Sequence, residues 1–269
     1  MNERSDQRTP PAGRVIFVSA GPGAADLITL RGARALGAAD VVLADALADP
    51  ALRDLAPQAR WVQVGKRGFE HSAKQTEINA LLVKAAREHA VVVRLKGGDA
   101  SVFGRLEEEL NALAAAGIAS EVVPGVTAAL AAAAQAQRPL TRRGRGRSVS
   151  LTTAMTEAGE LRAARSADTE VFYMAGRQLP ALGRQLLAAG WAADTPTLVV
   201  SRAGCADALT SEHRLADLAA AALLHRGRPT VVTVGAGAAA LNTPGKPAPA
   251  SKIAVSPAAE QATLTPSRT

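Results

Sequence analysis

Short apolar runs rich in β-branched residues alternate with longer stretches rich in alanine and leucine in the first half of the chain. The apolar runs predict strands at residues 15–18, 41–43, 61–64, 91–95 and 121–123. The stretches between them predict helices, for example at residues 75–88 and at residues 105–116, where Gly117 ends the helix. Strands that alternate with helices are typical of parallel βα units, so we expect an α/β fold with helices covering a sheet.

A basic stretch punctuated by glycine, residues 138–147, interrupts this pattern. Strands are predicted again at residues 148–152, 171–174, 197–200 and 230–234. We therefore expect two α/β domains, over residues 14–137 and 148–241, joined by the basic stretch. Residues 1–13 and 242–269 lack the periodicity of packed elements and are expected to be disordered tails.

The composition limits both the interior and the partners. Hydrophobic residues make up 48% of the chain but aromatic residues only 3%, so we expect an aliphatic, closely packed interior. The formal net charge of +7 favours an acidic partner, which from charge alone could be nucleic acid, anionic lipid or a polycarboxylate. No apolar segment approaches the roughly 20 residues that span a bilayer, and no signal segment is evident. We expect a cytoplasmic protein without membrane contact.

Cysteine and histidine offer no pattern of metal ligands. Cys205 is the only cysteine, and His71, His89, His213 and His225 are scattered along the chain. We therefore expect no disulfide, no cysteine nucleophile and no metal site.

Two glycine turns follow predicted strands. Gly21-Pro22-Gly23 comes after strand 15–18, and Gly97-Gly98-Asp99 comes after strand 91–95. Ligands of parallel α/β sheets bind beyond the carboxyl ends of the strands, and glycine lets the backbone approach a ligand that a Cβ would repel. The two turns therefore predict a small-molecule pocket, with Asp99 as an acceptor at its rim.

A dinucleotide is one candidate ligand for this pocket. Its fingerprint would need a third glycine where Asp26 stands, which weakens the match. Asp45, after the second predicted strand, could still bind a ribose hydroxyl, so a nicotinamide enzyme remains an alternative. A turn or a helix cap explains an aspartate at this position equally well.

Asp45 and Lys66 suggest proton transfer. Both follow predicted parallel strands, so the fold could bring a proton acceptor and a proton donor to the same rim. Lys66 and Arg67 stand between two glycines, a backbone that could fold around a ligand. The simpler interpretation of such a pair is solvated surface.

Further strand ends carry residues that could line a ligand site. Thr127 and Ala128 begin an alanine-rich helix after the fifth predicted strand, where an ordinary helix start is the simpler interpretation. Met174 ends a strand in the second half and could pack on a planar or sulfur-bearing ligand, although a buried core run is the default. Gly204 occupies the equivalent position after the next predicted strand.

The basic stretch contains Arg142, Arg143, Arg145 and Arg147. Its composition resembles RNA-binding Arg-Gly tracts, so a basic RNA-binding protein is the non-enzymatic alternative. No aromatic residues that would stack on bases are interleaved, which disfavours it. A cleft facing several carboxylates would need the same guanidinium groups.

Taken in order, these motifs resemble the uroporphyrinogen-III C-methyltransferases of the tetrapyrrole methylase superfamily over residues 14–241. Each motif is weak alone, and the ordered set is specific. The matching segments are residues 21–23 with 27–30, 64–67, 93–99, 102–105, 122–129 and 139–143.

The resemblance implies two α/β domains whose interdomain cleft holds S-adenosylmethionine, usually in a homodimer. It places the proton acceptor at Asp45 and the proton donor at Lys66. By matched position, the cofactor contacts are Pro22, Gly97, Gly98, Asp99, Val102, Thr127, Ala128, Met174 and Gly204.

The resemblance also implies the reaction. Methyl groups from two S-adenosylmethionine molecules pass in succession to C2 and C7 of uroporphyrinogen III, giving precorrin-2 through precorrin-1, with S-adenosylhomocysteine as the other product. This step belongs to sirohaem and cobalamin synthesis. The substrate carries eight carboxylates, and we expect Arg67, Arg142, Arg143 and Arg145 to bind them. Because the sulfonium is already an activated electrophile, no metal is needed, and no nucleic acid is expected as a partner.

The chain departs from the family pattern at three places. Around Asp45, Ala44 and Ala46 replace the larger residues that are usual there. The family commonly has Pro-Phe where this chain has Ala100-Ser101, and a glycine pair where it has Leu106-Glu107. These positions follow the cofactor turn. A methyltransferase of the same superfamily that acts on another precorrin is therefore the second alternative.

Overall fold

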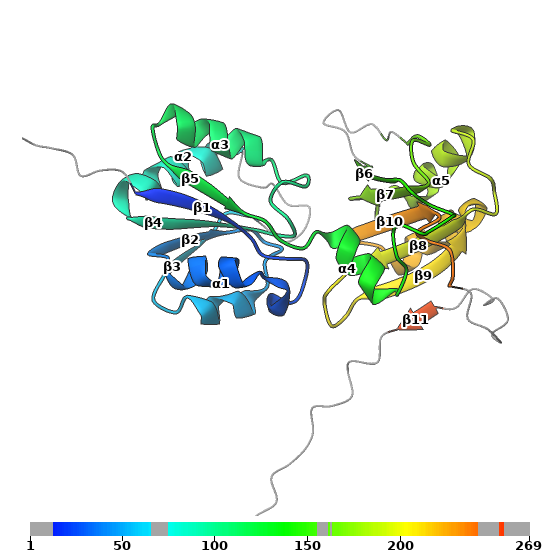
Figure 1. The fold of residues 1–269 in the computed structure, drawn as a ribbon, viewed down its shortest axis with the longest axis horizontal. Coiled ribbons are helices and arrows are strands. Elements are labelled where there is room, and N and C mark those ends of the chain that lie inside the picture. The colour runs from blue at the N-terminus through cyan, green and yellow to red at the C-terminus, as the bar shows by residue number, and fades with distance from the viewer. Residues whose placement is uncertain (1–12, 66–74, 155–160, 162, 242–252, 256–269) are drawn as a thin grey trace, which may run out of the picture. The chain divides into compact units, whose positions relative to one another are not determined.

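The computed structural model describes residues 13–65, 75–154, 161, 163–241 and 253–255. The chain divides into two compact units (Figure 1). The first comprises the residues up to Gly21 together with Ala25–Gly125. The second comprises Pro22–Ala24 and the chain from Val126 onward.

The basic stretch 138–147 lies within the second unit, which corrects the boundary predicted from the sequence. The main chain passes between the units at Gly125 instead. The stretch is anchored to the second unit because the carbonyl of Leu140 accepts a hydrogen bond of 2.9 Å from the Thr169 hydroxyl. The amide of Arg147 donates to Asp168 at 2.8 Å. Its glycine and arginine content resembles a linker, but these distant partners fix it.

The first unit is built on a five-stranded sheet in the order β3-β2-β4-β1-β5 (Figure 1). Every adjacent pair is parallel, which confirms the predicted βα organisation. The strands are β1 (Arg14–Ser19), β2 (Val41–Ala44), β3 (Arg60–Gln63), β4 (Val91–Lys96) and β5 (Ser120–Val123).

Helices cover both faces of this sheet. The helical elements are the 3₁₀ helices η1 (Ala25–Leu27) and η2 (Pro50–Leu55) and the α-helices α1 (Leu30–Gly37), α2 (Gln75–Glu88) and α3 (Leu106–Ala115). Successive residues of a strand point to opposite faces. Phe17 accordingly packs in one core cluster with Leu82 of α2, and Val18 packs in another with Leu36 of α1. The carboxyl ends of all five strands are therefore left at one edge, between two helical layers.

The second unit contains a mixed sheet in the order β11-β9-β8-β10-β7-β6. The pair β6–β7 is parallel, and the other pairs are antiparallel. The strands are β6 (Val149–Thr153), β7 (Thr169–Tyr173), β8 (Pro196–Ser201), β9 (Leu209–Arg214), β10 (Thr230–Gly235) and β11 (Ile253–Val255). The sequence predicted four of these. It missed β9, whose polar residues Thr210, Ser211 and Glu212 hide its strand pattern, and β11, which lies within the stretch expected to be a disordered tail.

The helices of the second unit pack on its aliphatic core. They are α4 (Ala128–Gln135), α5 (Leu179–Ala188), η3 (Leu215–Ala220) and α6 (Ala221–Leu224). Leu182 and Leu186 of α5 join Phe172 of β7 and Val199 of β8 in one cluster. In the described part of the chain, no helix has both the length and the apolar character needed to cross a membrane.

Candidate functional site

The two predicted glycine turns lie side by side at the carboxyl edge of the first sheet. The amide of Gly21 donates to the carbonyl of Gly98 at 3.1 Å, and the amide of Gly98 donates back to Gly21 at 2.9 Å. Gly98 has a φ of +68°, and a Cβ built there would meet no atom within 4 Å. The backbone of Gly98 therefore faces open space, as a ligand-binding turn requires.

Asp99 ties together the loops that follow β4 and β5. One oxygen of its carboxylate accepts from the Ser101 amide at 2.8 Å and from the Ser101 hydroxyl. The other oxygen accepts from the Gly125 amide at 2.8 Å. Burial raises the pKa of Asp99, but these hydrogen bonds outweigh it and hold the pKa below its ordinary value. Asp99 thus shapes the turn, and the amide of Val102 donates to its carbonyl at 3.1 Å.

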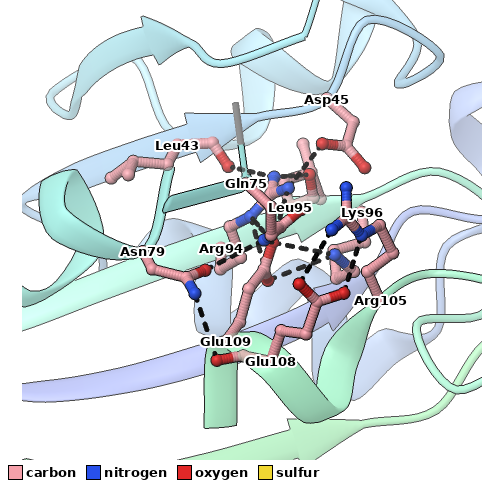
Figure 2. A network of polar contacts seen from close by, with 10 residues as sticks. All are labelled: Leu43, Asp45, Gln75, Asn79, Arg94, Leu95, Lys96, Arg105, Glu108 and Glu109. Atoms are coloured by element: carbon pink, nitrogen blue, oxygen red, sulfur yellow. Dashed lines mark hydrogen bonds and ion pairs between the residues drawn. The ribbon is translucent and has the colours of Figure 1, made fainter. Parts of the chain in front are cut away.

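A buried network of charges lies beneath this edge (Figure 2). The carboxylate of Glu109, on α3, is fully buried and accepts from Nζ of Lys96 at 3.1 Å at each oxygen. The guanidinium of Arg94 also donates to Glu109, at 3.1–3.2 Å. Its Nη2 donates to Oδ1 of Asp45 at 2.6 Å. Two cations from β4 are therefore balanced by two carboxylates.

Asp45 is the member of this network that reaches the surface. Its side chain is 31% exposed, whereas those of Arg94 and Lys96 are 2% and 3% exposed. Burial, and then the charge of Arg94, lower the pKa of Lys96 even though Glu109 and Asp45 oppose the shift. The sequence therefore places a carboxylate, held in one orientation by a buried guanidinium, at the same edge as the open Gly98 turn. Such a group can accept a proton from a bound molecule.

Lys66 and Arg67 lie outside the described residues. Gly65, which precedes them, packs against the residues after β2, because a Cβ built on it would lie 2.9 Å from the amide nitrogen of Ala46. The chain that enters this segment therefore starts beside Asp45, whose Cα is 3.6 Å from the same point.

The second unit holds the other predicted contacts, beginning with Thr127 and Ala128 at the start of α4. The hydroxyl of Thr127 is hydrogen-bonded to that of Tyr173 at 2.7 Å, and the amide of Ala129 donates to Tyr173 at 3.3 Å. Tyr173 thereby fixes the N-terminus of α4 to the end of β7. Met174, the next residue, has a φ of +57° and is 51% exposed, so it leaves the sheet rather than joining the buried run.

The two residues that follow Pro22 approach Gly204 within the second unit. The amide of Ala24 donates to the carbonyl of Gly204 at 3.0 Å. A Cβ built on Gly23 would lie 2.5 Å from the Gly204 carbonyl carbon, so only glycine allows this approach. The structure therefore divides the predicted contacts into two groups. Gly97, Gly98, Asp99 and Val102 follow β4 in the first unit, and Pro22, Thr127, Ala128, Met174 and Gly204 lie in the second.

The predicted arginines of the basic stretch lie elsewhere on the second unit. Arg142 and Arg145 line a pocket with Asp168 and Gly235, where β7 begins and β10 ends. Met174 follows the opposite end of β7. These two arginines are therefore not grouped with the second-unit contacts, and Arg143 is exposed beside them.

The sequence pattern predicts no role for four residues of the charged network and the β7–α4 contact: Arg94, Lys96, Glu109 and Tyr173. Arg94 carries a recognisable signal, because a charged residue inside an apolar central strand needs a buried partner. Glu109 carries none, because it follows two exposed glutamates, Glu107 and Glu108, from which the sequence does not distinguish it. In the described residues, no cluster of three or more histidine, cysteine or acidic side chains is placed to hold a metal.

A model of the family described as Tetrapyrrole (Corrin/Porphyrin) Methylases matches residues 14–219. Among similar proteins, the uroporphyrinogen-III C-methyltransferase of Pseudomonas aeruginosa is 46% identical over 196 residues, covering 71% of this chain and 80% of that protein. The uroporphyrinogen-III C-methyltransferase of Synechocystis is 43% identical, and the match covers 72% of this chain and 76% of that protein. The match to siroheme synthase 1 of Pectobacterium atrosepticum, at 45% identity, covers 75% of this chain but only 44% of that protein.

Solved structures agree with this match. Uroporphyrin-III C-methyl transferase from Thermus thermophilus, complexed with S-adenyl homocysteine, is 38% identical with a TM-score of 0.73, covering 83% of this chain and 97% of that one. The cobalt precorrin-4 methyltransferase CbiF is 28% identical with a TM-score of 0.72, and the match covers 82% of this chain and 94% of that one. The fold of the chain is thus that of known methyltransferases.

Proposed function

The chain belongs to the tetrapyrrole methylases, and we propose that it transfers methyl groups from S-adenosylmethionine to C2 and C7 of uroporphyrinogen III. The product is precorrin-2, formed through precorrin-1, for sirohaem or cobalamin synthesis. The observation that carries this proposal is the carboxyl edge of the first sheet. There the open Gly98 turn and the partly exposed carboxylate of Asp45 stand at the ends of adjacent strands, β4 and β2.

The residues present suit S-adenosylmethionine. The open backbone at Gly98 accepts close approach of a ligand. Gly97 and Val102 are predicted to contact the same ligand. Exposed Met174 and the backbone around Thr127 and Gly204 offer an apolar and hydrogen-bonding surface in the second unit. Bound there, the cofactor would supply an electrophilic methyl group for an electron-rich pyrrole carbon.

Asp45 is the proposed proton acceptor. Methylation of a pyrrole carbon leaves a proton to be removed, and a carboxylate at the rim can take it. The 2.6 Å hydrogen bond from Arg94 holds one oxygen of Asp45, so that the rest of the carboxylate faces the rim. Lys66 is the proposed proton donor, and Gly65 leads to it from beside Asp45.

The acidic substrate suits the positive charge of the chain. Its eight carboxylates would be attracted by the net charge of +7, and guanidinium groups match carboxylates with paired hydrogen bonds. Within this proposal Arg67 binds the substrate, and substrate binding by Arg142, Arg143 and Arg145 stays a prediction, because these three lie together in the basic stretch. Arg142 and Arg145 line a separate pocket at the opposite edge of the second sheet.

The proposal includes a homodimer in the cytoplasm that binds no nucleic acid. Light scattering on the purified chain would give the dimer mass, and cell fractionation would place it in the soluble fraction. A monomer, or tight RNA binding that falls steeply with salt, would contradict these parts.

Incubation of the purified chain with uroporphyrinogen III and methyl-labelled S-adenosylmethionine tests the reaction. Label is expected in a tetrapyrrole with methyl groups at C2 and C7, assigned by magnetic resonance. Parallel incubations supply other precorrins as acceptors. Label in one of these, with none in uroporphyrinogen III, would favour the alternative raised by Ala100 and Ser101, because the Ser101 hydroxyl bonds to Asp99 in the turn. No label in any tetrapyrrole would contradict both.

Gly98→Ala tests the cofactor surface. Its added methyl group enters the open space at φ +68°, so we expect weaker binding of S-adenosylhomocysteine in calorimetry. Gly117→Ala is a matched control, because Gly117 has a φ of +69° and equal space but lies after α3. Equal affinities in the two variants would remove Gly98 from the site.

A further inference from the structure

A pocket of about 320 Å³ lies in the second unit, at the sheet edge where β7 begins and β10 ends. Three arginines line it: Arg142, Arg145 and Arg165. Asp168 and Trp191 complete its polar and aromatic walls. The volume is at the lower end of the roughly 300–1,000 Å³ typical of ligand pockets, so it suits a small ligand.

The one carboxylate in this lining, that of Asp168, is engaged by the backbone. One of its oxygens accepts from the amide of Arg147 at 2.8 Å, and from the amide and hydroxyl of Ser148 at 3.1 and 2.9 Å. These hydrogen bonds hold the pKa of Asp168 below its ordinary value. Asp168 is therefore charged, but its hydrogen bonds serve the turn before β6 and not the arginines of the pocket.

The guanidinium of Arg165 is held in place by neutral groups. It lies over the ring of Trp191, 5.0 Å from the centroid, and donates to the carbonyl of Gly190 at 3.1 Å. Stacking of this kind orients the planar group while leaving its other donors available.

Arg142 is likewise bonded only to neutral acceptors, the carbonyls of Ala239 and Ala240. Burial, and then the charges of Arg138 and Arg145, lower the pKa of Arg142, which reflects the positive field around it. Counting only residues that the structure describes, none of the three lining arginines forms an ion pair with a carboxylate.

We propose that this pocket binds a small anion that carries more than one carboxylate or phosphate group. Three guanidinium groups against one engaged carboxylate leave an excess of positive charge, and their planar donors match these oxyanions. Arg165 and Arg142 are already fixed by Trp191 and by backbone carbonyls, so less conformational entropy is lost on binding.

The anion pocket lies apart from the cofactor contacts of the same unit. Met174 follows the far end of β7, and Gly204 lies beyond the far end of β8, whose first residue, Pro196, lines the pocket. Anion binding therefore does not rest on the proposed methyl transfer and can be tested without it.

Calorimetric titration of the full chain with sodium pyrophosphate, and separately with citrate, at constant ionic strength tests the proposal. We expect saturable binding of at least one of them, weakened about tenfold in Arg145→Ala and in Arg165→Ala, the loss of one charged hydrogen bond. Arg145 is the cleaner variant, because its side chain is exposed and supports no described contact. Arg214→Ala is the control, since Arg214 is an exposed arginine paired with Asp217 outside the pocket.

Preference for pyrophosphate or for citrate would identify the anion as phosphate- or carboxylate-bearing, and both results support the pocket. No saturable binding of either anion would overturn the proposal, and so would equal weakening by Arg214→Ala. Displacement of the bound anion by S-adenosylhomocysteine would also overturn it, because the pocket would then belong to the cofactor site.

Discussion

The two sheets hold two different buried polar networks, one of charged groups and one of neutral groups. Beneath the carboxyl edge of the first sheet, Arg94, Lys96 and Glu109 form a charged network that reaches the surface at Asp45. In the second unit, the network around His225 consists of neutral groups, and the buried carboxylate of Glu170 in β7 is not part of it. His225 is buried between the hydroxyls of Ser201, at 2.8 Å, and Ser211, at 2.9 Å, and Ser211 is also bonded to His213 at 2.7 Å.

The two networks differ in the free energy that burial of their groups costs. Buried charges lose several kcal/mol of hydration each, whereas neutral hydroxyls and imidazoles lose much less. The charged network orients a carboxylate at the edge that carries the candidate chemistry. The neutral one joins β8, β9 and the end of α6 within the core of its sheet.

Glu109→Gln should give the largest loss of stability. Removing the charge of Glu109 leaves Arg94 and Lys96 buried with one carboxylate between them, and such a change costs about 3–5 kcal/mol. Urea denaturation would measure this as a lower midpoint. The matched control is Glu107→Gln two residues earlier, where the side chain is exposed and the midpoint should stay close to wild type. Equal midpoints in the two variants would show that the network is not a buried charge cluster.

Lowering the pH should reduce the free energy of unfolding through His225 in the second network, by less than Glu109→Gln does. Burial, with the charges of His213 and Arg228, lowers the pKa of His225 from 6.5 to about 4. Between these values the unfolded chain binds a proton that the folded chain does not, so the free energy of unfolding falls as the pH falls. The full shift corresponds to about 3 kcal/mol.

His225→Gln isolates this effect from carboxylates that titrate in the same range. The variant should be less stable than wild type near neutral pH, and the difference should shrink as the pH falls from 6.5 toward 4. Denaturation midpoints at a series of pH values would show it. A difference that stays constant with pH would mean that His225 is not held neutral by its surroundings.

Tyr173→Phe should have the smallest effect. It removes the hydroxyl that bonds to Thr127 and to the amide of Ala129, with a loss of about 1–2 kcal/mol. A double-mutant cycle with Thr127→Ala would separate the pair from its surroundings, and we expect the two losses to be non-additive. Strictly additive losses would remove the proposed link between β7 and α4.

The first sheet was predictable from the sequence because its strands are apolar runs separated by helices. The second was less so, since β9 contains polar residues whose partners, such as His225, lie far along the chain. The turn residues Gly98 and Asp99 were found by their place after a strand. The burial of Glu109 could not be predicted, because the neighbouring residues are also glutamates and only the packing of α3 decides which of them is buried. The positive φ of Met174 likewise depends on tertiary structure.

The role of Asp45 is the central claim, and one measurement tests it most directly. Methyl transfer to uroporphyrinogen III by Asp45→Asn should be compared with its affinity for S-adenosylhomocysteine. Loss of a positioned proton acceptor predicts a turnover about 10²–10⁴-fold lower with cofactor affinity unchanged. Wild-type turnover, or a loss of cofactor binding that accounts for the whole defect, would contradict the assignment.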